Sequence, residues 1–342
     1  MRFASLLLTL WLPAAAAAQT GSGPNQATYT ITKLAEGVYT LTWTIPPGSF
    51  AIGNATFIVG DEDAIVVDTG LSRQAGDAIL GGLRQVTDKP VSMVINTHWH
   101  GDHIFGNQVF KKAFPAARFI AHAATREGII TGEIEYRDAN RPKTQARLEE
   151  LKARPSRTQA EDRELRVVEM RIDMWQGDYV LPDMLVGGKL TIMQGKRRID
   201  LLHLGSGNTA GDLIIHLPAE RIAINGDQAI TPVPFAYFCA PRAWIATLDR
   251  LAALDAGTFV PGHGRVQTSA QFIRDLQAML RSLVEQVDEG VKAGLDAEAI
   301  KARVKITPAA GSVYEKVPGA VLDANFRVPG IESALRELKV TG

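Results

Sequence analysis

The chain has 342 residues, which is long enough for one large domain or two small ones. Lysine and arginine together number 37, as do aspartate and glutamate, so the formal net charge is zero. A chain without net positive charge lacks the field that holds a nucleic acid, and we therefore expect a small-molecule substrate rather than a nucleic-acid partner.

The N-terminal residues 1–18 have the pattern of a secretory signal peptide. Arg2 precedes an apolar run over residues 6–12, and an Ala-x-Ala cleavage site lies before Gln19. The apolar run is too short to cross a bilayer, so we expect an exported, periplasmic or secreted protein with no membrane contact once the signal is removed. Cys239 is the only cysteine and cannot form an intramolecular disulfide, so the exported fold must depend on its core or on metals.

The first third of the mature chain alternates like a sheet. Apolar patterns predict strands over residues 29–32, 38–42, 54–59, 64–67 and 91–95. We expect Gly21 to Asn25 to form a flexible segment before these strands. The fourth strand ends in Asp68-Thr69-Gly70, and an amphipathic helix is predicted over 74–86.

Four metal-type ligands follow the strand at 91–95 within six residues: His98, His100, Asp102 and His103. His98 and His100 are two apart, so both rings can face the same side of an extended segment. The chain then turns into a predicted helix at 103–113, which points Asp102 and His103 elsewhere. One metal ion could take the first pair and a second ion the other, and imidazole with carboxylate suits zinc, iron or manganese.

The middle of the chain carries one further strand and a charged segment. A strand over 118–121 ends in His122, which either lines a site or packs and caps. Residues 133–175 are rich in charged side chains with periodic leucines, and we predict a helical insertion of one or two exposed helices that covers the edge of the fold. Two more strands are predicted, over 189–193 and 198–202.

Two turns after the insertion add candidate ligands. Residues 203–212 form a glycine-rich turn that contains Asn208, while His203 five residues earlier is interpreted as core or as support for a ligand. A strand over 213–217 carries His216, which we interpret as structural. The next strand ends in Asp227.

The last third surrounds one more histidine. Residues 231–240 form an aromatic, proline-containing loop that could wall a pocket, with Tyr237 as a possible hydrogen-bond donor to substrate. A helix over 242–254 leads to the strand before His263, which lies between two glycines that let the backbone approach closely. A long helix over 269–295 and a mixed segment over 296–340 follow, and we expect this extension to contact none of the motifs.

These landmarks resemble, in order, those of the metallo-β-lactamase superfamily. The stretch His98-Trp99-His100-Gly101-Asp102-His103 resembles its His-x-His-x-Asp-His signature, and His263 resembles its final histidine ligand. The resemblance covers about residues 27–280. It implies an α/β fold, a four-layer αββα sandwich of two mixed β-sheets flanked by helices. We therefore divide the chain into a signal peptide (1–18), a catalytic domain (19–280, with the insertion at 133–175) and a C-terminal helical extension (281–342).

The resemblance also implies roles for the candidate residues. Asp68 would support the metal-binding loop, and Asp227 would bridge two metal ions. Asp102, His103 and His263 would hold the second ion. The family's third histidine ligand of the first ion is replaced by Asn208, a neutral and weaker ligand than imidazole. We therefore expect the first ion to be weakly bound, to be a metal other than zinc, or to be absent in the resting enzyme.

The function implied is hydrolysis by a metal-activated water, with one or two zinc ions per chain and with Asp102 and Asp227 as catalytic carboxylates. Export and zero net charge favour a small carbonyl substrate: a β-lactam, a lactone, or another ester or amide. Two alternatives stay open. The first is an iron-containing redox enzyme on the same scaffold, and the second is a non-catalytic relative that lost turnover through the change at Asn208.

Overall fold

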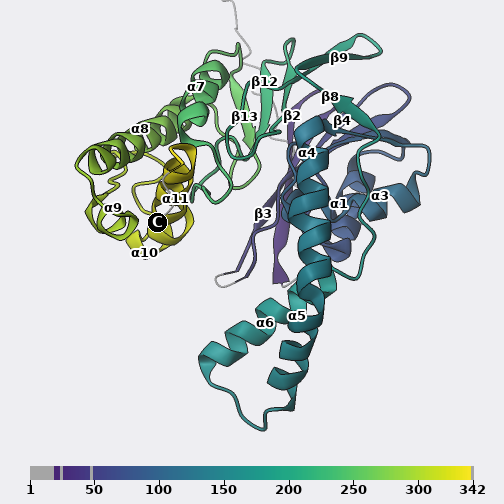
Figure 1. Ribbon diagram of the computed structural model, residues 1–342. Coiled ribbons are helices and arrows are strands. Elements are labelled where there is room, and N and C mark those ends of the chain that lie inside the picture. Colours follow the sequence, from purple (N-terminus) through teal and green to yellow (C-terminus); the bar gives the residue numbers. More distant parts are fainter. Residues whose placement is uncertain (1–18, 24–25, 47–48, 340–342) are drawn as a thin grey trace, which may run out of the picture.

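The computed structural model describes residues 19–23, 26–46 and 49–339 of the chain. The predicted signal peptide lies outside the described residues. Figure 1 shows two β-sheets, a helical cluster beside them and a helical arm that projects away from both. Among the described helices, none has the length and apolar character needed to cross a membrane.

The first sheet contains eight strands in chain order within the described residues. They are β1 (Gln19–Ser22), β2 (Thr28–Ala35), β3 (Val38–Thr44), β4 (Ala55–Val59), β5 (Ala64–Val67), β6 (Val91–Ile95), β7 (Arg118–His122) and β8 (Met184–Val186). β1 to β5 pair antiparallel, and β5 to β8 pair parallel. Gly21 belongs to β1, so the expected flexible segment is in part an edge strand paired with β2.

In the part of the chain that the structure describes, the second sheet has five strands in the order β13-β12-β11-β10-β9. They are β9 (Lys189–Gln194), β10 (Arg197–Leu202), β11 (Ile214–Leu217), β12 (Ile222–Gly226) and β13 (Thr258–Pro261). β9 to β12 are antiparallel neighbours, whereas β12 and β13 run parallel. The carboxyl ends of β12 and β13 therefore lie side by side, which brings the residues that follow them together.

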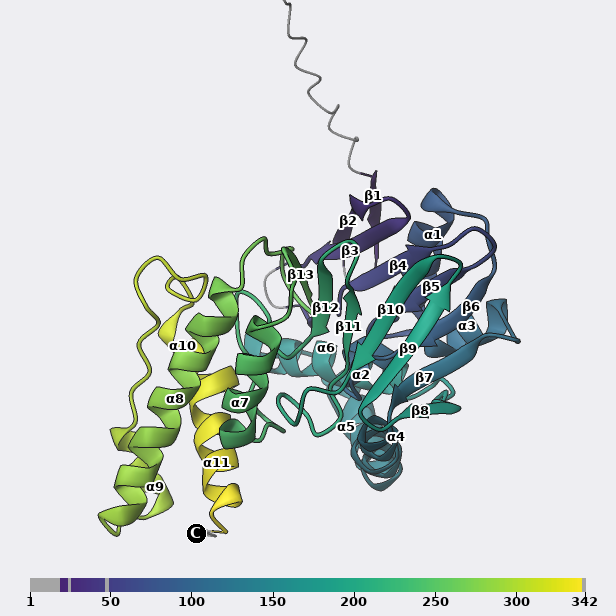
Figure 2. The same cartoon turned by 90° about the horizontal axis from the view of Figure 1, so that it is seen from above.

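Apolar side chains of both sheets fill the space between them. Val67, Ile95 and Ile120 of the first sheet belong to one buried cluster with Ile215 and Ile224 of the second. Outside the first sheet, α1 (Arg73–Val86) and α3 (Asn107–Ala113) bury their apolar faces. Outside the second, α7 (Pro241–Ala252) and α8 (Gln271–Lys292) do the same. The view in Figure 2 shows these layers in sequence, and the predicted αββα sandwich is confirmed.

The helix expected at 103–113 is divided into α2 (Gly101–Ile104) and α3, with Gly106 between them. A Cβ atom on Gly106 would lie 1.9 Å from the carbonyl oxygen of Thr69, so the chain passes directly against the loop after β5 at this point. This close approach interrupts the helix and places α2 against the ends of β5 and β6.

The charged middle segment forms the arm in Figure 1. A nearly continuous helical run comprises α4 (Ala123–Gly128), the π-helical turn η2 (Ile129–Glu135) and α5 (Tyr136–Ala153), and α6 (Gln159–Met174) folds back along α5. The two helices bury a small core of their own. The far end of α6 returns to the body, where Met170 and Met174 pack near Ile52.

The C-terminal residues pack into the same apolar cluster as α7 and α8. They form α9 (Ala297–Arg303), α10 (Gly319–Leu322), the π-helical turn η3 (Asp323–Arg327) and α11 (Val328–Glu337). Tyr314, Phe326 and Ile331 are fully buried there. The extension is thus a structural continuation of the outer helical layer.

Candidate metal centre

The centre is built from loops at the carboxyl ends of strands in both sheets. His98 and His100 follow β6, and α2 carries Asp102 and His103 directly after them. Asp227 follows β12, and His263 follows β13. Two groups of three side chains gather there, each with its ligand atoms within 4.8 Å of one another: His98, His100 and Asp227 in the first, and Asp102, His103 and His263 in the second.

In the first group, the Nε2 atom of His98 lies 3.0 Å from Nδ1 of His100 and 3.7 Å from Oδ2 of Asp227. All three side chains are buried. The fold thereby points two imidazole nitrogens and a carboxylate at one small volume.

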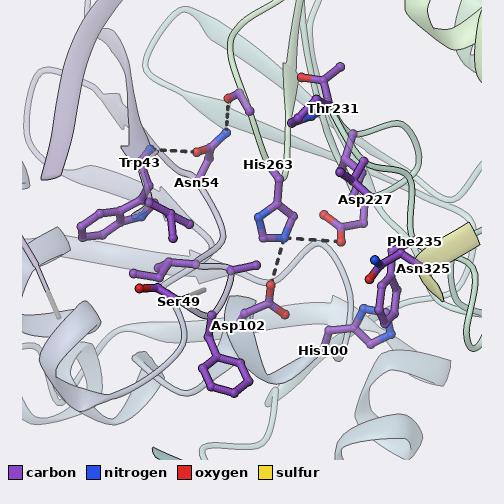
Figure 3. Close-up of a pocket in the computed structure, with 18 of the residues that line it drawn as sticks. Trp43, Ser49, Asn54, His100, Asp102, Asp227, Thr231, Phe235, His263 and Asn325 are labelled. Carbon is purple, nitrogen blue, oxygen red and sulfur yellow. Dashed lines mark hydrogen bonds and ion pairs between the residues drawn. The ribbon is translucent and has the colours of Figure 1, made fainter. Parts of the chain in front are cut away.

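In the second group, Oδ2 of Asp102 lies 2.9 Å from Nε2 of His263 and 3.6 Å from Nε2 of His103. Asp227 also reaches this group, with Oδ1 at 3.3 Å from His103 and Oδ2 at 3.6 Å from His263. Figure 3 shows Asp102 and Asp227 both approaching the ring of His263. Asp227 therefore lies between the two groups, where the sequence predicted a bridging carboxylate.

Asp68 orients these histidines from behind. Its carboxylate accepts hydrogen bonds from the amide and the hydroxyl of Thr97 at 2.8 and 2.7 Å, and it lies 2.8 Å from Nδ1 of His103. The Thr97 hydroxyl proton is thus committed to Asp68, so its oxygen accepts from Nδ1 of His98, 3.0 Å away. In both histidines Nδ1 carries a proton, so Nε2 is the ring nitrogen that faces the centre.

Burial and charge divide the two groups electrostatically. Burial lowers the pKa of His98 and brings that of His100 to about 4, so both rings stay neutral near pH 7. Burial also disfavours charge on His103 and His263, but nearby carboxylates, that of Asp227 foremost, outweigh it and raise the pKa of both. In the chain without metal, the imidazoles of the second group therefore bind protons at a place where a metal cation would also be favoured.

The residues present fit metal ions. Two neutral imidazoles direct nitrogen atoms at each other at 3.0 Å in the first group. Among the described residues, the buried atoms Nε2 of His100 and Oδ1 of Asp227 have no hydrogen-bond partner. Buried polar groups are rarely left unpaired, and nitrogen with carboxylate oxygen is a ligand set for zinc, iron or manganese. A Cβ on Gly262 would lie 2.0 Å from Oδ1 of Asp227, so this glycine is needed for the backbone to pass so close.

Asn208 lies in the loop between β10 and β11 and is completely buried. Its Nδ2 atom donates to the carbonyl of Phe235 at 2.7 Å, and its Oδ1 atom has no hydrogen-bond partner among the described residues. The ring of Phe235 in turn contacts that of His100, with 5.5 Å between centroids. Asn208 is thus connected to the first group through Phe235 and retains an unpaired oxygen.

The centre opens into a cavity of about 940 Å³ (Figure 3). His100, Asp102, Asp227 and His263 line it with polar atoms. Most of the remaining wall is apolar and comes from residues within 43–46, 49–52 and 230–238. The predicted aromatic loop therefore does wall the pocket.

Other predicted residues lie elsewhere or act differently. His122 caps α4, accepting from the amide of Ala124 at 3.1 Å, and its ring stacks on that of His203 at 4.1 Å, outside both groups. Buried His216 contacts the carbonyl of Asp255 at 3.2 Å. Tyr237 lines the cavity, but its hydroxyl donates to the carbonyl of Ala324 at 2.9 Å rather than pointing a free proton at substrate.

Cys239 is buried, and burial raises the pKa of its thiol to about 12. A thiol that stays protonated is a poor nucleophile.

Three contributors to the cavity were missed from the sequence. Residues 43–52 show only a proline-glycine break after a strand, Arg171 is one of many charged residues in the insertion, and Asn325 belongs to the extension. The expectation that the extension contacts no motif is therefore wrong. Glu133 of η2 is also close to the centre: burial, aided by the charge of Asp102, raises its pKa to about 8. None of these had a local pattern that distinguishes it from an ordinary surface residue.

An αββα sandwich with paired histidine and carboxylate groups between its two sheets defines a class of metal-binding proteins. The sequence model of the Metallo-beta-lactamase superfamily matches residues 48–263, and the chain belongs to this superfamily. This confirms the resemblance on which the predicted fold was based.

Two individual proteins illustrate the relationship. Linear primary-alkylsulfatase from Pseudomonas sp. (strain ATCC 19151) is 23% identical over 275 residues, which are 73% of this chain and 49% of the relative. The chain therefore spans about half the length of this curated relative. Among solved structures, Metallo-beta-lactamase from Pontibacter korlensis aligns with a TM-score of 0.53 and 16% identity, covering 74% of this chain and 99% of that one. This second likeness concerns the fold.

Proposed function

We propose that the protein is a metal-dependent hydrolase of small, largely apolar molecules. One observation carries the proposal: two ligand groups that meet at Asp227 lie at one side of a cavity with mostly apolar walls. Such cavities, with a few convergent polar groups, are typical of small-molecule sites. Membership of the superfamily supports metal-dependent hydrolysis as the reaction class.

The chain's residues divide the work. His98, His100 and Asp227 would hold one ion, and Asp102, His103 and His263 the other. When bound, such ions act as Lewis acids and lower the pKa of a coordinated water to about 7. Asp102 is 20% exposed and lines the cavity, so its carboxylate can pass a proton toward a leaving group. Asp227 is buried and positions the groups on either side of it.

Two classes of substrate are candidates, and they differ in the bond that is cleaved. The sequence favours a carbonyl substrate, such as a β-lactam, a lactone, or another ester or amide. The printed name of the relative, an alkylsulfatase, favours a sulfate ester. Both reactions need a polarised oxygen and an attacking water, which the same residues would serve. A panel of one β-lactam, one lactone, one carboxylic ester and one alkyl sulfate separates them by turnover.

Zinc is the metal that we propose, with iron or manganese as the alternatives that the ligand set accepts. We also propose export to the periplasm or beyond, because residues 1–18 have the pattern of a signal peptide. Recovery of the protein from the periplasmic fraction tests the export, and elemental analysis of that protein, purified without added metal, tests the metal. Two zinc ions per chain would support both groups as working sites, and one would leave the Asp102 group working alone. Iron would favour the redox alternative, and bound metal without turnover on the panel would favour the non-catalytic one.

Replacing Asp102 tests the reaction. Asp102→Ala should abolish turnover and release the ion of the second group, because one of three ligands and the proton carrier are lost together. The matched control is Asp138→Ala on the arm, where the side chain is 62% exposed. Retained activity in the Asp102 variant would overturn the proposed mechanism.

Asn208→His tests the first group. The imidazole would supply the ligand type that the family turn otherwise carries, so metal occupancy of the first group should rise. Metal content per chain at limiting zinc measures this. An unchanged stoichiometry would mean that Asn208 does not face the first ion.

A further inference from the structure

The cavity contains one permanent positive charge, that of Arg171. The acidic and basic side chains around it are His100, Asp102, Asp227, His263 and Arg171, and the first four belong to the two ligand groups. Apolar side chains make up most of the rest: Trp43, Ile45, Phe50, Ile52, Val233 and Phe238. Among the described residues, Arg171 is therefore the only charged lining residue that is not a candidate metal ligand.

Arg171 also differs from three other arginines of the helical arm. Arg147, Arg154 and Arg157 each pair with a carboxylate, at nitrogen–oxygen distances of 2.6–2.9 Å. Within the described part of the chain, the guanidinium of Arg171 forms no hydrogen bond and no ion pair. It lies 5.9 Å from the ring of Trp175, and Glu133 interacts with it only at longer range. An arginine with five unused donors is the side chain best suited to bind an anionic oxygen group.

The arm holds Arg171 in place. On either side of it in α6, Met170 and Ile172 are anchored: Met170 packs against the cluster that contains Ile52, and Ile172 is buried in the core of the arm. Ile52 itself lines the cavity. Arg171 therefore lines the cavity from a helix that is fixed to one of the cavity's walls.

We propose that Arg171 is an anion-binding, specificity-determining residue, so that the substrate combines an apolar body with a negatively charged oxygen group. The apolar walls would bind the body, and the guanidinium would bind a carboxylate, sulfate or similar group through paired hydrogen bonds. This inference rests on the proposed hydrolase function for its meaning, but its binding prediction stands without turnover.

The test compares ligands that share one chain and differ in charge. Isothermal titration calorimetry measures the Kd of 1-octanesulfonate, octanoate and 1-octanol for the metal-containing protein as purified. Arg171→Met keeps an unbranched apolar stem and removes the charged guanidinium. Arg166→Met removes the same charge from an exposed position of α6 that does not line the cavity. We expect Arg171→Met to weaken both anions by about tenfold or more, the usual effect of losing one charge-assisted contact, and to leave octanol unchanged.

The remaining outcomes are distinct. Arg166→Met should change none of the three affinities. The difference between wild type and Arg171→Met should shrink as salt is added, since Arg171 is exposed. A selective loss for only one anion would name its headgroup as the preferred one. Anion affinities equal to wild type, or an equal loss for octanol, would overturn the proposal.

The same variants separate this inference from the proposed function. If the wild type hydrolyses no substrate on the panel but Arg171→Met still loses anion affinity, the hydrolase proposal fails and the anion site stands. If hydrolysis occurs and anion affinity does not depend on Arg171, the reverse holds.

Discussion

Asp68 is the single side chain that ties the metal-binding loop to the first sheet. It adopts φ +58°, a conformation that asparagine also tolerates, and it accepts from Thr97 and His103 at 2.7–2.8 Å. Asp68→Asn should preserve the fold, but the new amide N–H donors would face the donor groups of Thr97 and His103. We expect about 10–100-fold weaker metal affinity, the usual cost of losing such an outer hydrogen bond.

Competition with a chromophoric chelator measures that affinity. Asp77→Asn, at an exposed position of α1, is the control and should bind metal as wild type does. Unchanged metal affinity in Asp68→Asn would show that the histidine ligands do not need the hydrogen bonds of Asp68 to bind metal.

At the scale of elements, the C-terminal extension clamps the pocket loop. The hydroxyl of Tyr314 donates to the carbonyl of Ile230 at 2.9 Å, and the carbonyl of Asn325 accepts from the amide of Ala236 at the same distance. The loop between these points supplies the aromatic wall and, through Phe235, the partner of Asn208.

Tyr314→Phe should therefore destabilise the protein and loosen the loop, because Tyr314 is fully buried and its partner carbonyl would be left unpaired. We expect a loss of about 1–3 kcal/mol in the free energy of unfolding. Urea denaturation measures the loss, and hydrogen exchange should speed up within residues 230–239. Tyr136→Phe, at a half-exposed position on the arm, is the control. Equal exchange in both variants would argue against a clamp.

Local patterns could predict the elements that carry the site but not how distant segments meet. Alternation and apolar runs predicted β2 to β7, and the spacing of His98 to His103 indicated ligands, because these signals lie within a few residues. The break at Gly106 depends on a contact with Thr69 that no local pattern encodes. Arg171 resembles the other arginines of the insertion in sequence, and only the packing of α6 near Ile52 places it at the cavity.

At the scale of the whole molecule, the metal centre joins the two sheets. His98 to His103 follow a strand of the first sheet, whereas Asp227 and His263 follow strands of the second. An ion shared by these side chains would bind the folded state and not the unfolded chain. Chelation with EDTA should therefore lower the free energy of unfolding, by about 2.7 kcal/mol where free metal had exceeded its Kd a hundredfold.

Denaturation midpoints before chelation, after chelation and after zinc is restored measure the effect. Asp102→Ala, which lacks a ligand of the second group, should respond less to EDTA than the wild type. Identical midpoints in all three states would mean that the centre contributes nothing to holding the sheets together.

The pH dependence of stability should change sign with metal. In the chain without metal, burial opposes charge on His103 and His263, but their carboxylate neighbours outweigh it and raise each pKa above the ordinary 6.5. A raised imidazole pKa stabilises the folded state fully below 6.5, and that contribution is lost as the pH rises through the folded value. With EDTA present, the free energy of unfolding should therefore fall as the pH rises above 6.5.

The slope should approach about 1.4 kcal/mol per pH unit for each imidazole. With zinc present the opposite holds, because protons compete with the metal for the same nitrogens and binding tightens as the pH rises. Urea denaturation at a series of pH values, with EDTA and with zinc, measures both slopes, and His263→Gln should reduce the slope in EDTA. Parallel curves in the two conditions would mean that protons and metal do not occupy the same site, and the cluster would then be an ion-pair network rather than a metal centre.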